Sequence, residues 1–134
     1  MIYAVIGTNR QTIVPDDFSY TLVTNEVLMS EERPLSTSVA KEDGTWVTPP
    51  STYTVYKCVD GKLAIDVNNT YENIARDYEP QYNTVQKGIG TAIISLYSNK
   101  ITQVQYDSNM ASLSASMIAL TTQLKTEQEV AING

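Results

Sequence analysis

A run of apolar residues in the last third of the chain alternates in spacing between four and three, and no other pattern limits the possible folds as strongly. The run consists of Tyr106, Met110, Leu113, Met117, Leu120 and Leu124. This spacing places all these side chains on one side of a helix and is typical of the seam between two packed helices. We call these residues the seam. The sequence therefore predicts a long helix that packs through it.

A second helical pattern precedes the seam and begins after Val67. Its apolar residues recur every three or four positions, at Tyr71, Ile74, Tyr78, Tyr82, Val85, Ile89, Ala92 and Leu96. The polar stretch YSNK, residues 97–100, predicts a turn between the two patterns. Two helices of roughly 25–30 residues joined by a tight turn should form an antiparallel hairpin.

Several residues predict how the first of these helices begins and bends. Asn68, Asn69 and Thr70 are candidate N-terminal caps, and the acidic residue Glu72 suits a first turn. Pro80 predicts either a kink or a fresh helix start, because proline removes a backbone donor. Further along, two glycines in the segment KGIGTA would let another backbone approach closely.

The first 67 residues show the patterns of β-strands. Asp43-Gly44 and Asp60-Gly61 are both flanked by β-branched or aromatic residues, and each pair is a common hairpin turn. Residues 1–7 predict a short strand, whereas residues 20–30 are ambiguous between strand and helix. We therefore predict an α+β fold. A small domain rich in β-hairpins, residues 1–67, precedes a coiled-coil-like helical hairpin, residues 68–134.

Charge and hydropathy exclude some classes of partner. The formal net charge is −6, from 15 acidic and 9 basic residues, and the basic residues are scattered singly. Because phosphate binding depends on clustered Lys and Arg, we expect no nucleic-acid partner. No run approaches the ~18 apolar residues of a membrane span, and the N-terminus lacks the pattern of a signal peptide. We expect a soluble protein in a cytoplasm, with no membrane partner.

The sequence offers few reactive groups. There is no histidine, and Cys58 is the single cysteine, so neither a zinc site nor a nucleophile with a histidine base is predicted. The acidic pairs Asp16-Asp17 and Glu31-Glu32 adjoin turn residues and suit solvated loops better than a catalytic pair. No phosphate loop or dinucleotide fingerprint is present. We therefore predict no enzymatic activity, cofactor or metal; a small enzyme using carboxylates or tyrosines is the least favoured alternative.

Residues 28–50 combine four elements in order: Met29, Arg33-Pro34, Val39-Ala40 and Asp43-Gly44-Thr45-Trp46. This order of a Met-containing strand, an Arg-Pro step, a Val-Ala-like pair and an Asp-Gly-x-Trp hairpin resembles small tail proteins of bacteriophages and prophages, of the tail-fibre assembly and fibre-associated type. Residues 78–134 are similar more loosely, through the aromatic-x-Pro-Gln-aromatic step at Tyr78–Tyr82 and the closing Asn133-Gly134.

The resemblance implies a binding function without catalysis. The expected partner is a phage tail fibre or another tail-tip protein, which this chain would bind as an assembly chaperone, an attachment adaptor or both. It would act in the host cytoplasm during assembly and in the virion tail if retained there. A homo-oligomer or multi-copy assembly is also expected. The alternative is a prophage-encoded regulator or helical protein-binding module that is absent from the virion.

Partner-binding residues are expected in both halves of the chain. Trp46 is either an anchor packed on its own sheet or a large interface contact, and Arg33 with Pro34 forms a rigid entry to the hairpin. The other candidates are the six residues of the seam, in which Met110 and Met117 serve as fillers or as an adaptable patch.

Further apolar residues fall outside the seam. They are Ile93, Ile94, Tyr97 and Ile118. Their positions predict that more than two helices meet, through self-association or with a partner's helices. The alternative is that the hairpin packs onto the protein's own sheet.

Overall fold

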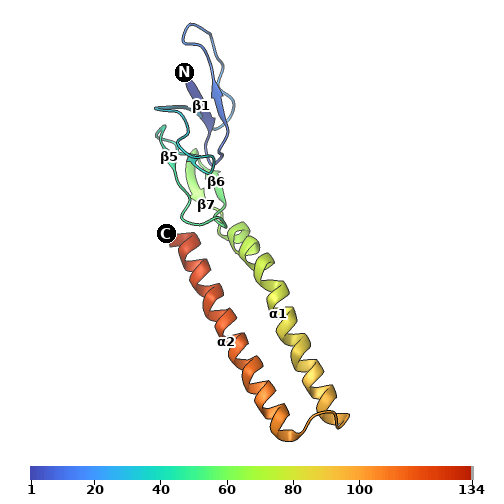
Figure 1. Cartoon of the computed structure of the whole chain (residues 1–134). Helices are drawn as coiled ribbons and strands as arrows, with labels where there is room; N and C mark the ends of the chain where they lie inside the picture. Colours follow the sequence, from blue (N-terminus) through green and yellow to red (C-terminus); the bar gives the residue numbers. More distant parts are fainter. Residues whose placement is uncertain (134) are drawn as a thin grey trace. The chain divides into compact units, whose positions relative to one another are not determined.

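The computed structural model describes residues 1–133 and has the predicted α+β fold, with seven short strands followed by two long helices (Figure 1). Contacts between residues divide the chain into two compact units. The β unit contains residues 1–70 together with the end of the last helix from Val130 onwards. The helical unit is Tyr71–Glu129.

A three-stranded antiparallel sheet forms one part of the β unit. Its central strand, β1 (Ile2–Val5), pairs with β2 (Gln11–Ile13) on one side and β3 (Glu26–Met29) on the other. The ambiguous residues 20–30 therefore contain a strand at their C-terminal end. One face of the sheet carries the small core of this unit. The core consists of Ala4, Met29 and Ala40, with Ile2, Val27 and Trp46 packed against it.

Both predicted hairpins are confirmed. The first joins β4 (Val39–Ala40) to β5 (Trp46–Val47), and the second joins β6 (Tyr56–Val59) to β7 (Lys62–Ile65). Gly44 has a φ of +83°, and a Cβ there would lie 2.6 Å from the carbonyl oxygen of Leu28. Only glycine fits this position, because the conformation and the neighbouring β3 backbone both exclude a side chain.

Helix α1 (Val67–Tyr97) begins earlier than the sequence predicted. The cap is Asp66, whose Oδ1 accepts a hydrogen bond of 3.1 Å from the backbone N–H of Asn69. The expectation that Asn68, Asn69 or Thr70 caps the helix is therefore wrong, because all three lie within its first turn. Glu72 consequently falls in the second turn.

Pro80 lies inside α1, which continues without interruption, so the predicted fresh helix start is wrong. Pro80 is exposed, so water can reach the carbonyl that lost its partner. Tyr78 and Val85 on either side are buried and hold the segment by packing.

Helix α2 (Gln103–Asn133) follows a short connection. Tyr97 is still helical, so the turn lies slightly later than the predicted residues 97–100. Thr102 caps α2: its hydroxyl accepts from the N–H of Gln105, whose side chain in turn accepts from the N–H of Thr102. The proposed Asn133-Gly134 terminator lies partly outside the described residues.

Candidate functional site

The seam packs α2 against α1 within the helical unit. All six seam residues are half-buried, and most other side chains between Gln103 and Gln123 are exposed. On α1 the facing residues are more deeply covered. They are Ile74, Tyr78, Val85 and Ala92, none of them more than 8% exposed. Burial raises the pKa of Tyr78. The seam residues therefore hold α2 against α1 within this chain.

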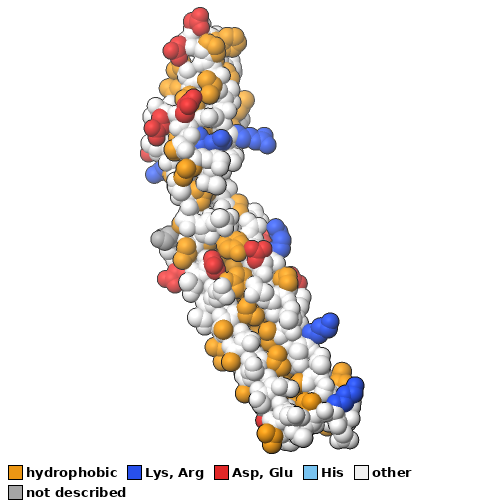
Figure 2. All heavy atoms as spheres, viewed as in Figure 1, with side chains coloured by type: hydrophobic (Ala, Val, Ile, Leu, Met, Phe, Trp, Pro, Cys, Tyr) orange, Lys and Arg blue, Asp and Glu red, His pale blue; other side chains and the backbone are white. Residues whose placement is uncertain are grey.

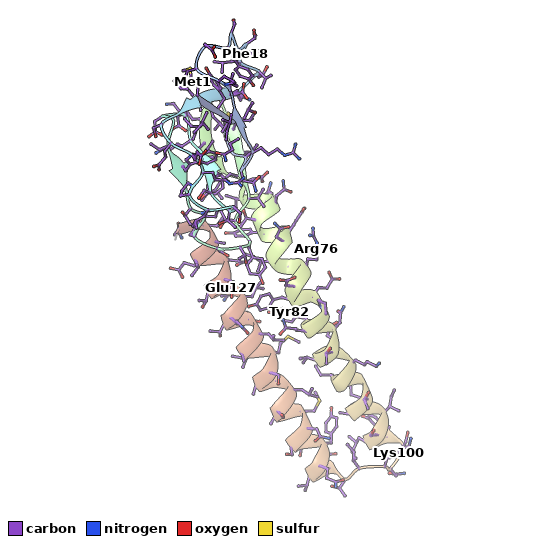
Figure 3. All side chains as sticks on the ribbon, turned by 45° about the horizontal axis from the view of Figure 1, so that its top comes forward. Met1, Phe18, Arg76, Tyr82, Lys100 and Glu127 are labelled. Atoms are coloured by element: carbon purple, nitrogen blue, oxygen red, sulfur yellow. The ribbon has the colours of Figure 1, made fainter. Side chains whose placement is uncertain are left out.

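Two contacts define how the helices meet. A Cβ on Gly88 would lie 2.8 Å from Cδ2 of Leu113, so Gly88 leaves space for a seam side chain of the same chain. Tyr82 points from α1 toward α2 (Figure 3), and its hydroxyl lies 2.9 Å from Oγ1 of Thr121. Gly90 differs, because a Cβ there would meet nothing within 4 Å.

Both helices also carry large apolar side chains that face away from the seam. On α1, Ile94 is 66% exposed and Tyr97 is 82% exposed. On α2, Val104 is 78% exposed and Ile118 is 65% exposed. We call these four residues the outer apolar residues. Single exposed apolar side chains are ordinary. Here Ile94, Tyr97 and Val104 lie close to the turn, whereas Ile118 lies about four helical turns further along α2.

Val104 did not stand out in the sequence. Without the start of α2 at Gln103, it belongs to no apolar spacing on either helix. Its separation of 14 residues from Ile118, four helical turns, places both on the same side of α2. If a single long helix had been assumed, this spacing from Ile118 could have identified Val104 as an exposed apolar residue.

The part of the hairpin near its turn is almost free of charge. Among residues 88–124, only Lys100 and Asp107 are charged. By contrast, residues 67–87 include Glu72, Arg76, Asp77, Glu79 and Lys87. In Figure 2, white and orange atoms predominate over this end of the hairpin. Solvated helices normally present many charged side chains, whereas most exposed positions of this segment carry serine, threonine, alanine, asparagine or glutamine.

A groove of about 500 Å³ lies between α1 and α2 in the same weakly charged segment. Its lining includes Gly88, Ala92 and Leu113, so the seam is accessible there from outside. Each of two packed helices covers the other on one side only. The groove is the place where the seam residue Leu113 remains accessible between the two helices. Most of the other lining residues are polar, namely Thr84, Lys87, Thr91, Ser95, Asn109 and Ser112.

Trp46 and Arg33 lie in the β unit, and the seam residues lie in the helical unit. Trp46 packs against Ala40 of its own hairpin and against Ala4 and Met29 of the three-stranded sheet, and its Nε1–H donates to the carbonyl of Glu31 at 2.9 Å. Arg33 accordingly belongs to a fixed loop. Its backbone N–H donates to the Gln11 side chain at 3.0 Å, and its guanidinium donates to the carbonyl of Asn9. Both residues stabilise the loop after β3.

Cys58 and the acidic pair Asp16-Asp17 lie in different parts of the β unit. Within residues 1–133, no three His, Cys, Asp or Glu side chains are grouped so as to hold a metal ion. Cys58 is a half-buried thiol in β6. Asp16 binds the N-terminal amino group at 2.9 Å, and its neighbour Asp17 is exposed.

Neither described helix combines the length and apolar content that crossing a bilayer would require. The chain matches no protein-family model, and comparisons with curated proteins and with solved structures found no similar protein.

Proposed function

We propose that this chain is a non-enzymatic component of a bacteriophage tail. It binds the tail fibre or another tail-tip protein through the helical hairpin, as an assembly chaperone, an attachment adaptor or both. The observation that carries the proposal is the weakly charged segment 88–124 with its outer apolar residues. The resemblance of residues 28–50 to small tail proteins supplies the kind of partner.

The outer apolar residues lie on both helices, so both helices could contact a partner. Ile94 and Tyr97 are three positions apart and adjoin each other on α1, whereas Val104 and Ile118 belong to α2. Apolar area on both helices would be covered if the hairpin became part of a bundle with helices of another chain. Full burial of a large apolar side chain contributes roughly 1.5–3 kcal/mol, and association itself costs several kcal/mol, so these four residues would serve as anchors within a larger interface.

Seam substitutions are poor tests of this proposal, because seam residues already hold α1 against α2. Outer positions are better. We expect Ile94→Glu combined with Ile118→Glu to abolish co-purification with the fibre while the helical circular dichroism signal stays unchanged. Asn83→Glu is a matched control, because Asn83 is an exposed helical position in the charged part of the hairpin.

The N-terminal and C-terminal halves of the fibre should be tested separately as bait. Retention of binding by the double variant, with normal helicity, would exclude the hairpin as the binding surface. Failure of the wild-type chain to bind either half would instead favour the regulator or binding module that is absent from the virion. Mass spectrometry of purified particles then separates a retained component, which is present, from a chaperone, which is absent.

A further inference from the structure

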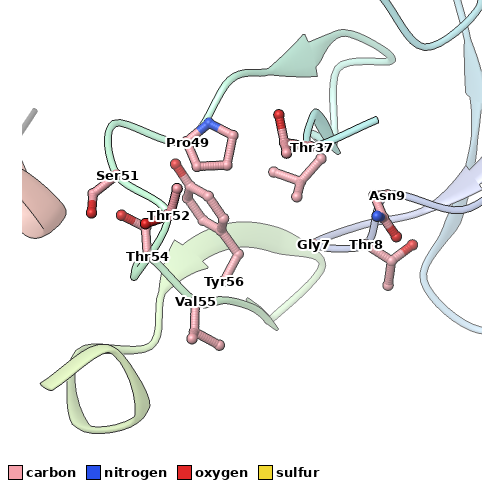
Figure 4. Close-up of a pocket in the computed structure, with 11 residues that line it drawn as sticks. Gly7, Thr8, Asn9, Thr37, Pro49, Ser51, Thr52, Thr54, Val55 and Tyr56 are labelled. Carbon is pink, nitrogen blue, oxygen red and sulfur yellow. The ribbon is translucent and has the colours of Figure 1, made fainter. Parts of the chain in front are cut away.

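The β unit contains a cleft that the hairpin proposal does not use. Three segments that are distant in the sequence line it, around residues 7–9, 37–39 and 49–56, and its volume is about 480 Å³ (Figure 4). This size lies within the usual range of small-molecule sites, about 300–1,000 Å³. None of the lining residues is charged.

The lining combines apolar surface from Val39, Pro49 and Val55 with uncharged polar side chains around the ring of Tyr56. Hydroxyls come from threonine, serine and tyrosine side chains, and Asn9 adds an amide. Figure 4 shows the ring of Tyr56 extending toward Pro49, with Thr52 beside it and with Thr37 and Asn9 across the cleft. Burial raises the pKa of the Tyr56 hydroxyl above its ordinary value of 10.0.

Some of these polar groups are held by hydrogen bonds of the fold but can still form further hydrogen bonds. Thr8 Oγ1 donates to the carbonyl of Val5 at 2.8 Å, and Asn9 Nδ2 donates to the carbonyl of Ser36 at 3.0 Å. Ser51 Oγ accepts from the N–H of Tyr53 at 3.1 Å. Thr8 and Asn9 therefore retain oxygen lone pairs for a ligand, and Ser51 retains its proton.

Other polar groups of the cleft are not used by the fold. Within residues 1–133, the hydroxyls of Thr37, Thr52 and Tyr56 form no hydrogen bond with another side chain or with the backbone. Each can both donate and accept. The cleft thus offers hydroxyls without a partner in the fold together with hydroxyls that the fold orients, beside one apolar ring face.

The lining restricts the chemistry of the ligand. A phosphate or carboxylate would find no cation among the lining residues, and an ammonium group would find no acid. A purely apolar ligand would deprive several hydroxyls of water without replacing their hydrogen bonds. A sugar fits both requirements, because its hydroxyls donate and accept and its C–H face can pack on a tyrosine ring.

We propose that this cleft binds a neutral saccharide, with the ring of Tyr56 against the sugar face and with Thr37, Thr52 and Asn9 bonding its hydroxyls. The proposal does not rest on the hairpin or on a phage partner. An uncharged peptide segment is the competing ligand, because backbone amides also bond to neutral hydroxyls. Pro49 and Tyr56 would then contact its side chains.

The full chain should be tested by saturation-transfer NMR at millimolar ligand. The probes are free glucose, galactose, N-acetylglucosamine and their disaccharides, with sialic acid as an anionic comparison and a proline-rich peptide as the competing class. We expect at least one neutral sugar to bind. We expect Thr37→Val and Thr52→Val each to weaken this binding about three- to tenfold, and Tyr56→Ala to abolish it.

Two controls separate recognition from folding. Tyr71→Ala removes a tyrosine outside the cleft and should leave the affinity unchanged. Thr37→Val and Thr52→Val keep the side-chain shape and remove no hydrogen bond of the fold, so both variants should unfold at the wild-type urea concentration. Absence of any neutral-sugar signal, binding of the peptide or sialic acid alone, or sugar binding insensitive to all three cleft variants would overturn the proposal.

Discussion

Leu113 of α2 occupies the space that the missing side chain of Gly88 leaves on α1. Alanine exceeds glycine in helix propensity by about 1 kcal/mol, so Gly90→Ala, where a Cβ meets nothing, should stabilise the protein by about that amount. Gly88→Ala should stabilise the protein less than Gly90→Ala does, or should destabilise it, because the new Cβ forces Leu113 to move. Urea unfolding followed by circular dichroism measures both.

The same pair permits a stricter test. In a Leu113→Ala background the obstruction is gone, so Gly88→Ala should there give the full gain of about 1 kcal/mol. Equal effects of Gly88→Ala in both backgrounds would show that the two residues do not meet.

Thr70 connects the start of α1 to the segment before β6. It is fully buried; its Oγ1 donates to the carbonyl of Asp66 at 2.7 Å and accepts from the N–H of Val55 at 3.0 Å. Thr70→Val keeps the shape but leaves that N–H without a partner, so we expect a loss of about 1–3 kcal/mol in unfolding free energy. Thr84→Val is the control. Thr84 makes a similar bond within the helix at an exposed position, and its replacement should change stability by less than about 0.5 kcal/mol.

Glu42 makes the β unit sensitive to acid. The backbone N–H of Leu63 donates to its Oε2 at 2.8 Å and thereby lowers the pKa of this carboxyl below its ordinary value of 4.5. A lowered pKa means that the ionised form stabilises the fold above pH 4.5 and that this contribution disappears as the pH falls through the lower value. Glu42→Gln should therefore lower the urea midpoint more at pH 7 than at pH 3. Glu32→Gln, in an exposed loop, should show no such difference, and an equal effect of Glu42→Gln at both pH values would contradict the assignment.

Tyr20 provides the opposite pH dependence. Its ring stacks on Tyr3 with centroids 4.6 Å apart, and its hydroxyl donates to Oε2 of the buried Glu26 at 3.0 Å. This hydrogen bond raises the pKa of Tyr20 above its ordinary value of 10.0. The contribution is therefore complete below pH 10 and is lost as the pH rises through the raised value. Tyr20→Phe keeps the stack and should destabilise the protein at pH 7, with a smaller difference from wild type at pH 11. A difference that does not decrease with pH would show that the hydroxyl is not bonded to Glu26.

Local patterns predicted most of the fold. Asp43-Gly44 and Asp60-Gly61 determine their hairpins because tight turns need positive φ, and the sequence displays that requirement directly. The seam likewise identified the helical pairing, because an unbroken heptad spacing has few other uses.

The features that the sequence did not predict depend on tertiary structure. Asp66 precedes the first apolar residue of the helical spacing, so the sequence gives no sign that it is the cap. Its role becomes clear only because the structure shows that the helix begins at Val67. Pro80 is tolerated because the packing of buried residues on both sides of it outweighs the loss of one backbone hydrogen bond. The sequence around Pro80 does not reveal that packing. The cleft around Tyr56 joins segments about 50 residues apart, and hydroxyls of that kind look like ordinary loop residues in a sequence.

The hydroxyl of Thr54 donates to the carbonyl of Ala131 at 2.8 Å, so the β unit holds the returning end of the hairpin as well as its beginning. Both ends of the helical segment therefore belong to the β unit, and the residues between them can vary in number. Removing seven residues from each helix, or adding seven, would keep every seam position in register while the two attachment points stay the same. Insertions and deletions of this kind could therefore change the length of the helical unit while leaving the residues of the β unit unchanged.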